Sequence, residues 1–127
     1  MILPIEFRYR KPRVTSRDKR TAPSGALEHQ DLLSGFVRLH VLHHAVKEDV
    51  YGQWMIEELA RHGYRLSAGT LYPMLHAMER RGYLKSTQVQ VGRTHRRVYR
   101  ATALGQEALD AAETKLRELF REVVEER

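Results

Sequence analysis

One stretch decides the fold: residues 67–102 read SAGTLYPMLHAMERRGYLKSTQVQVGRTHRRVYRAT. Ser67 can cap a helix, and Gly82 suits the left-handed residue that ends it. Two strand-like runs follow, Tyr83–Val91 and His95–Thr102, on either side of a turn that contains a glycine. Runs of this kind are typical of a β-hairpin. The stretch therefore predicts a helix followed by a hairpin, which is the second half of a winged helix-turn-helix.

The segments before this stretch predict the first helices of that fold. Glu28–Val46 carries apolar residues around most of a helical circumference, which indicates a helix that is buried on more than one side. A polar break at 47–49 follows it. Tyr51–His62 then predicts a second helix with one apolar face, and Gly63 is placed to end it in a left-handed conformation.

A long helix is predicted after the hairpin, capped by Thr102 and running from Ala103 to about Glu126. Its apolar residues recur at alternating spacings of three and four, which is a heptad seam. A helix of this length presents more apolar surface than a small domain can cover, so we predict a homodimer. The predicted dimerisation residues are Leu33, Phe36, Leu109, Ala112, Leu116, Leu119, Phe120 and Val123.

The fold class that follows is mainly α with a small β-hairpin (α+β). Residues 1–27 have no apolar period and contain three prolines, so we interpret them as a flexible basic arm. Residues 28–102 form the predicted winged helix-turn-helix DNA-binding domain, and residues 103–127 form the predicted C-terminal dimerisation helix.

The positive charge of the chain is unevenly distributed. The sequence pI is about 9.9, but much of the excess lies in residues 1–27, with seven basic side chains against two acidic ones. Residues 61–100 hold nine basic side chains against one acidic one. Because attraction to phosphate is screened beyond roughly 10 Å at ordinary salt, this local block matters more than the total charge.

Composition also limits the class of protein. The chain has no cysteine, which excludes disulfides, thiolate metal sites and cysteine nucleophiles. No stretch approaches the roughly 18 apolar residues of a membrane span, so we expect a soluble cytoplasmic protein without a membrane partner. There is no glycine-rich phosphate loop, nucleophile elbow or paired carboxylates, so we expect no enzyme and no cofactor.

The helix after Ser67 has one apolar and one polar face. Leu71, Leu75 and Met78 share the face that would point to the core. The opposite face carries Gly69, Thr70, Pro73, His76, Ala77 and Arg80, with Tyr72 on the shoulder. Because Pro73 removes one hydrogen bond, the regular helix begins as late as Thr70 or is kinked near Gly69. This polar face can approach DNA, although any surface helix has a polar side.

The hairpin carries a cluster of cations: Arg93, His95, Arg96, Arg97 and Arg100. Guanidinium groups placed so close together repel one another, and a polyanion would relieve that repulsion. Because side chains alternate along a strand, we expect two or three of them to contact phosphate. The alternative is a solvated, charged hairpin that discourages pairing between sheet edges.

Several of these segments resemble the PadR family of bacterial transcriptional regulators, in particular its shorter subgroup with a single C-terminal helix. The resemblance covers about residues 30–125. It rests on Tyr51-Gly52, on Ser67 to Leu75 with its Gly-Thr-Leu-Tyr-Pro run, on Gly82-Tyr83-Leu84, and on Arg96 to Thr102 with Gly105. It implies a homodimeric repressor that binds duplex DNA at a pseudo-palindromic operator and releases it when a small molecule binds. The DNA contacts implied or predicted here are Ser67, Thr70, Tyr72, Pro73, His76, Arg80, Arg93, His95, Arg96 and Arg97.

The sequence also allows an effector site, a metal site and a protein-interaction surface. Phe36, Trp54, Met55 and Phe120 are candidates for an effector cavity, although such side chains more often belong to a core. His40 and His44 stand four residues apart and could bind a metal in a metal-responsive regulator, but no third ligand is apparent and we expect no metal. The basic hairpin could also meet an acidic protein, in which case the fold would be a protein-interaction module.

Overall fold

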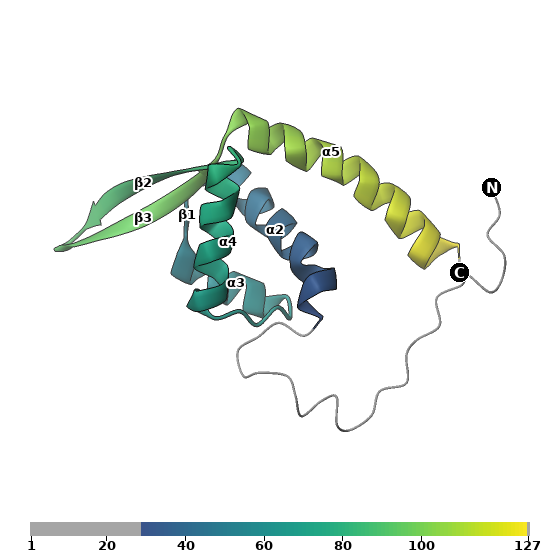
Figure 1. Cartoon of the computed structure of the whole chain (residues 1–127), viewed down its shortest axis with the longest axis horizontal. Helices are drawn as coiled ribbons and strands as arrows, with labels where there is room; N and C mark the ends of the chain where they lie inside the picture. Colours follow the sequence, from purple (N-terminus) through teal and green to yellow (C-terminus); the bar gives the residue numbers. More distant parts are fainter. Residues whose placement is uncertain (1–28, 127) are drawn as a thin grey trace, which may run out of the picture.

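The structure is a computed structural model that describes residues 29–126. Its elements follow in the order α2 (Gln30–Lys47), β1 (Val50–Tyr51), α3 (Gly52–Arg61), α4 (Ala68–Arg80), β2 (Leu84–Val91), β3 (Thr94–Ala101) and α5 (Ala103–Phe120), continued by a π-helical turn, η2 (Arg121–Glu125) (Figure 1). The predicted fold class is confirmed: the chain is mainly helical, with a small sheet. The predicted basic arm, residues 1–27, lies outside the described residues.

The two predicted strands of the hairpin are confirmed to within one residue at each end, and a third strand ties the hairpin to the domain. Strands β2 and β3 pair in antiparallel register from Leu84 opposite Ala101 to Val91 opposite Thr94, and they project from the domain as the wing (Figure 1). Strand β1 adds a third strand on the other edge of β3. Strand β1 is not predictable from the sequence, because two residues are too few to show an alternation of apolar and polar side chains.

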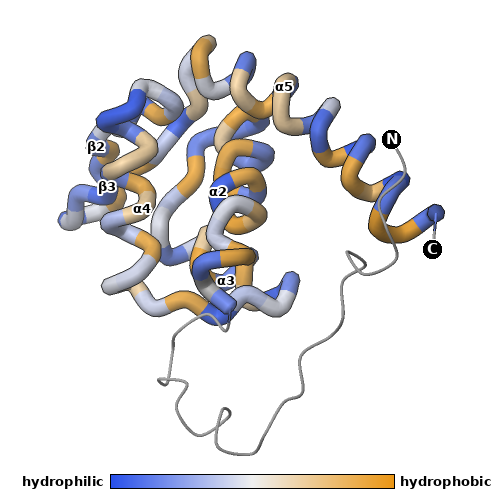
Figure 2. Tube along the Cα trace, turned by 45° about the vertical axis from the view of Figure 1, so that its right-hand side comes forward, coloured by the Kyte–Doolittle hydropathy of each residue, from blue (hydrophilic) through white to orange (hydrophobic). Residues whose placement is uncertain are grey.

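The core lies where α2, α3 and α4 meet under the base of the sheet (Figure 2). Leu71, Leu75 and Met78 are buried, as the helical pattern predicts. Tyr99 brings the sheet into the same core and is fully buried. Its hydroxyl has no hydrogen-bond partner within the described residues, and burial raises the pKa of that hydroxyl above its usual value.

Helix α4 begins earlier than one of the two predicted alternatives allows. Its first residue is Ala68, so a start as late as Thr70 is wrong and Pro73 lies inside the helix. A proline at this position deprives the carbonyl of Gly69 of its helical donor. Gly69 is exposed, so water can satisfy that carbonyl. Gly82 follows the end of α4 and has φ 88°, which is the predicted left-handed conformation.

Helix α5 is anchored at its first turn and becomes more exposed toward its end. The hydroxyl of Thr102 accepts a hydrogen bond from Gly105 N at 3.0 Å, which is the predicted cap. Farther along, Leu109 packs against the core, whereas Leu119 and Phe120 are 47% and 53% exposed. Figure 1 shows this end of α5 projecting from the domain. No helix between residues 29 and 126 has the length and apolar character that a membrane span requires.

Candidate nucleic-acid interface

The ten residues predicted to contact DNA all reach the surface, and they come from two elements. Ser67, Thr70, Tyr72, Pro73, His76 and Arg80 belong to α4 and its N-cap; Thr70 and Tyr72 are half-buried and the other four are exposed. Arg93, His95, Arg96 and Arg97 belong to the wing and are all exposed. The structure thus places a helix and a basic hairpin next to each other in the arrangement that a winged helix-turn-helix requires.

The N-terminus of α4 is open. Ser67 occupies the N-cap position, but its hydroxyl does not cap the helix and instead lies 3.3 Å from the Thr70 hydroxyl. The prediction that the Ser67 side chain caps α4 is therefore wrong, because the neighbouring hydroxyl competes for it. Without that side-chain cap, amides of the first turn remain available to an anion, which the helix dipole also attracts.

Tyr72 is held in place from the neighbouring helix. Its hydroxyl and ring edge lie against Gly52, the first residue of α3, and its ring packs at the border of the core. Tyr72 is therefore not a freely swinging surface side chain. Its position depends on a residue that the sequence analysis quoted only as part of a family motif.

One wing arginine points toward α4 and is held there by a relay of hydrogen bonds. Arg97 Nη1 donates to Ser86 Oγ at 2.9 Å, and Ser86 Oγ donates to Glu79 Oε2 at 2.7 Å. Glu79 is the single acidic residue of the basic block 61–100. A carboxylate that orients an arginine through a hydroxyl reduces the freedom that the guanidinium loses on binding a phosphate.

Two other wing arginines lie on the opposite face of β3, as alternation along a strand requires. The guanidinium carbon of Arg96 lies 5.7 Å from the centre of the Tyr51 ring, at cation–π distance. Arg100 Nη1 lies 3.2 Å from Asp49 Oδ1, and both side chains are about half exposed. Arg100 is therefore partly neutralised within the chain, whereas the cation–π contact leaves the charge of Arg96 in place.

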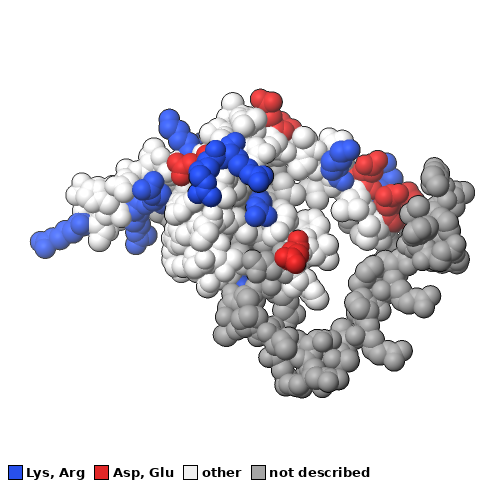
Figure 3. All heavy atoms as spheres, in the orientation of Figure 1, with Lys and Arg blue, Asp and Glu red and all other residues white. Residues whose placement is uncertain are grey.

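The charges of the molecule are segregated along these elements. Figure 3 shows Lys and Arg side chains on the wing, out to its tip, and over the core beside it, whereas acidic side chains gather along α5. Arg93 occupies the turn between β2 and β3, next to Gly92 with φ 61°. A two-residue turn at the tip thus presents a cation farthest from the core.

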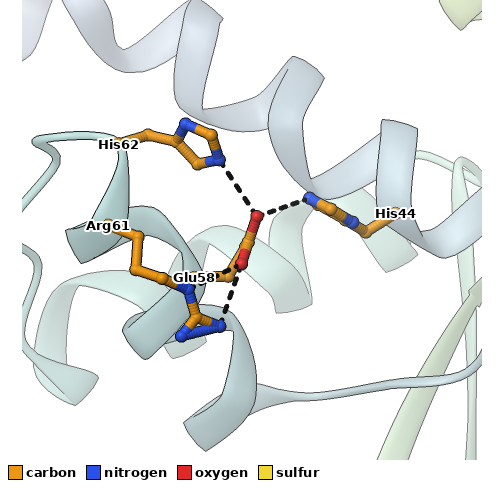
Figure 4. A network of polar contacts seen from close by, with 4 residues as sticks. All are labelled: His44, Glu58, Arg61 and His62. Atoms are coloured by element: carbon orange, nitrogen blue, oxygen red, sulfur yellow. Dashed lines mark hydrogen bonds and ion pairs between the residues drawn. The ribbon is translucent and has the colours of Figure 1, made fainter.

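A cluster of histidines surrounds Glu58 on the side of the domain where α2 meets α3 (Figure 4). Glu58 Oε2 lies 3.0 Å from His62 Nε2 and 3.3 Å from His44 Nε2, and Arg61 Nη2 lies 3.0 Å from Oε1. The hydrogen bond from His62 lowers the pKa of Glu58, and Arg61 adds to this effect. His40 stacks on His62 with ring centres 5.0 Å apart, and burial lowers the pKa of His40.

These contacts bear on the metal-binding alternative. His44 is directed at Glu58 and His40 at the ring of His62, so the two do not converge on one point. In residues 29–126, no three His, Cys, Asp or Glu side chains are arranged to hold a metal ion. The metal-responsive alternative therefore gains no support from the geometry of this pair.

The histidine cluster predicts that stability falls in acid. Because the pKa of His40 is below 6.5 in the folded chain, the unfolded chain binds more protons as the pH drops through 6.5, and folding weakens. The lowered pKa of Glu58 adds a further loss below pH 4.5. We expect the Tm to fall between pH 7 and pH 5, and His40→Phe to reduce that fall. His95→Phe, which removes an exposed histidine of the wing, is the control; an equal effect of both variants would contradict the prediction.

The four candidates for an effector cavity are separated in the structure. Phe36 and Phe120 line one groove of about 690 Å³ between α2 and the end of α5. Trp54 instead packs edge-on against His44, with ring centres 5.1 Å apart. Met55 is fully buried in the core. The structure therefore brings Phe36 and Phe120 together, but not Trp54 and Met55 with them.

Comparison with known proteins assigns the chain to a family. The sequence profile described as "Transcriptional regulator PadR-like family" matches residues 41–111. The chain belongs to this PadR-like family. A transcriptional regulator from Mycobacterium tuberculosis is 54% identical over 88 residues, which make up 69% of this chain and 82% of that protein. The resemblance to the PadR family is thus confirmed at the level of the family, whereas the shorter subgroup with a single C-terminal helix stays a prediction. The family consists of transcriptional regulators rather than enzymes.

Solved structures of PadR-like proteins share the fold. A PadR family transcriptional regulator from Eggerthella lenta is 31% identical, with a TM-score of 0.67, over 76% of this chain and 85% of that one. A PadR-like transcriptional regulator from Bacillus cereus is 25% identical, with a TM-score of 0.68, over 73% and 92% of the two chains.

The PadR-like match covers the elements that carry the predicted DNA contacts but ends before most of the predicted dimer seam. Residues 41–111 include all of α3, α4 and the wing, whereas Leu116 and the apolar residues after it lie beyond the match. The sequence predicts α4 and the basic wing as elements. It does not reveal the contact of Gly52 with Tyr72 or the relay from Arg97 through Ser86 to Glu79. Only Gly52 carries a signal in the sequence, since a glycine that opens a helix calls for an explanation.

Proposed function

We propose that this PadR-like regulator is a cytoplasmic homodimeric repressor that binds duplex DNA at a pseudo-palindromic operator and is released by a small-molecule effector. The observation that carries the proposal is the pairing of an open N-terminus on α4 with a wing whose exposed Arg93 and Arg96 make no ion pair within the described residues. Such a surface fits a polyanion that has a groove of helix width.

The proposed division of labour between the two elements follows from their chemistry. The first turns of α4 enter the major groove, where Thr70 and Tyr72 donate to phosphate or contact a thymine methyl, and Pro73 packs close to the DNA. His76 and Arg80 extend the same face toward base edges or phosphate. Arg93, His95, Arg96 and Arg97 bind the flanking backbone, which supplies affinity rather than sequence preference.

Apolar exposure supports the proposed dimer. Phe36 of α2, 36% exposed, lines one groove with the exposed Leu119 and Phe120 of α5, and Leu32, one helical turn before Phe36, is 76% exposed. A second copy that packs α5 into this region would cover both sets, and twofold symmetry would then present two recognition helices to DNA. Leu33, Leu109, Ala112 and Leu116 are already half-buried within one chain, so they would form the floor of the interface.

The proposed effector binds the groove lined by Phe36 and Phe120. Because this groove lies between α2 and α5, a ligand there would change how the two copies pack and hence the spacing of the two recognition helices. The effector thus acts on the dimer geometry and not on the DNA contacts themselves.

Selection of bound duplexes from a random pool tests this function. We expect the full chain to recover a twofold-symmetric sequence whose half-sites lie about one or two helical turns apart. A promoter carrying that sequence should be repressed by the chain in a reporter assay, and a ligand-release screen should find compounds that restore expression. Recovery of no preferred duplex, together with binding to an acidic protein, would identify a protein-interaction module instead.

A further inference from the structure

We propose that Gly52 is a positioning residue for DNA recognition: by having no side chain, it seats the hydroxyl of Tyr72 against the start of α3 and fixes the ring on the DNA-facing side of α4. This inference rests on the proposed contact between Tyr72 and DNA. It concerns a buried residue on a different helix, α3.

The space beside Gly52 is filled by the side chain of Tyr72. A Cβ placed on Gly52 would lie 2.6 Å from Cε1 of Tyr72 and closer still to its Cζ and its hydroxyl oxygen. Side-chain carbons do not approach ring atoms this closely, so any residue larger than glycine at position 52 displaces the Tyr72 ring.

The backbone conformation of Gly52 does not require a glycine. The glycines with positive φ in residues 29–126 are Gly63, Gly82 and Gly92, and Gly52 is not among them. Its backbone is one that alanine adopts readily, and alanine is the better helix former. Only the space occupied by Tyr72 therefore requires a glycine at this position.

The hydroxyl of Tyr72 is positioned by packing. Within the described residues, the hydroxyl of Tyr72 makes no hydrogen bond, and the ring is only half-buried. Contact with Gly52 is thus the constraint on the hydroxyl end of the side chain. A hydroxyl that is held by packing and not by a hydrogen bond keeps its donor available for a phosphate oxygen.

The contact between Gly52 and Tyr72 lies next to the base of the wing. Gly52 directly follows β1, whose residues Val50 and Tyr51 pair with Tyr99 and Val98 of β3. Tyr51 also carries Arg96 over its ring. The β1–Gly52 junction therefore touches both DNA-facing elements, so that the Tyr72 hydroxyl and the base of the wing share one rigid support.

A double-mutant cycle in the full chain tests the proposal. The variants are Gly52→Ala, Tyr72→Ala and the two combined, and the probe is a duplex recovered by the selection described above. We expect each single variant to bind about tenfold more weakly than the parent chain. Because Tyr72→Ala removes the ring that the new methyl group displaces, the double variant should bind no more weakly than Tyr72→Ala alone.

The results distinguish failure of the proposed Tyr72–DNA contact from failure of the positioning role of Gly52. If Tyr72→Ala binds DNA as the parent does, the Tyr72 contact within the proposed function is wrong. If Tyr72→Ala weakens binding but Gly52→Ala does not, or if the two losses multiply in the double variant, the positioning role of Gly52 is overturned while the DNA contact stands. Thermal unfolding accompanies every variant: should Gly52→Ala fail to fold, the proposal requires that Tyr72→Ala restore folding, and failure of the double variant to fold would also overturn it.

Discussion

Replacing Arg96 and Arg97 together by alanine should weaken binding to duplex DNA by at least about 100-fold at moderate salt, since each charge-assisted bond to phosphate contributes about 1.5–3 kcal/mol and every 1.4 kcal/mol is a factor of ten. The two side chains leave opposite faces of β3: Arg97 is held by Ser86, and Arg96 lies over the ring of Tyr51. They therefore cannot replace one another on the same phosphate, and their losses should be nearly independent.

Salt dependence provides the sharper measurement of the same change. A plot of log affinity against log salt falls with a slope of about −0.9 for each phosphate that the protein neutralises. Loss of two contacts should make the slope shallower by about 1.8. A matched control replaces Lys47 and Lys115, which are exposed on α2 and α5, and removes the same charge away from the wing.

The control also defines the contrary result. If both double variants shift the slope equally, the wing acts only through net charge and its arginines make no defined phosphate contacts. A slope that is near zero for the parent chain between 50 and 200 mM salt would remove the phosphate mechanism altogether.

The local parts of this surface are predictable from the sequence because their signals lie within a few residues of one another. The period of Leu71, Leu75 and Met78 fixes which face of α4 is buried, and the glycine between two β-rich runs fixes the wing. Both signals depend on spacing alone, so one sequence is enough to recover them.

The remaining parts depend on contacts between distant residues, which spacing does not reveal. Strand β1 exists because Val50 and Tyr51 pair with β3, nearly fifty residues later in the chain. The seat of Tyr72 on Gly52 and the relay from Arg97 through Ser86 are also tertiary contacts. The sequence thus predicts which elements face DNA, whereas the structure is needed to see what holds their side chains in place.

The largest effect on assembly is expected from charge placed in the proposed dimer seam. Leu119→Glu combined with Phe120→Glu places two carboxylates in each copy at positions that are about half exposed in one chain. In a twofold dimer all four carboxylates would be buried together, and an unpaired buried charge costs several kcal/mol. We expect the dimer dissociation constant to rise by at least about 1,000-fold, because every 1.4 kcal/mol is a factor of ten. Sedimentation equilibrium measures this change directly.

The fold of each chain should survive these substitutions, because neither side chain belongs to the core, and circular dichroism checks this. Ala111→Glu combined with Thr114→Glu is the matched control, since it adds two carboxylates at exposed positions on α5 away from the seam. Operator binding should fall with the dimer, because two linked half-site contacts gain about 10²–10⁴ in avidity that one copy lacks. A variant that remains dimeric would place the interface elsewhere. A variant that becomes monomeric yet binds the full operator as tightly as the parent chain would show that one recognition helix and one wing are enough, which would contradict the symmetric mode of binding proposed for this regulator.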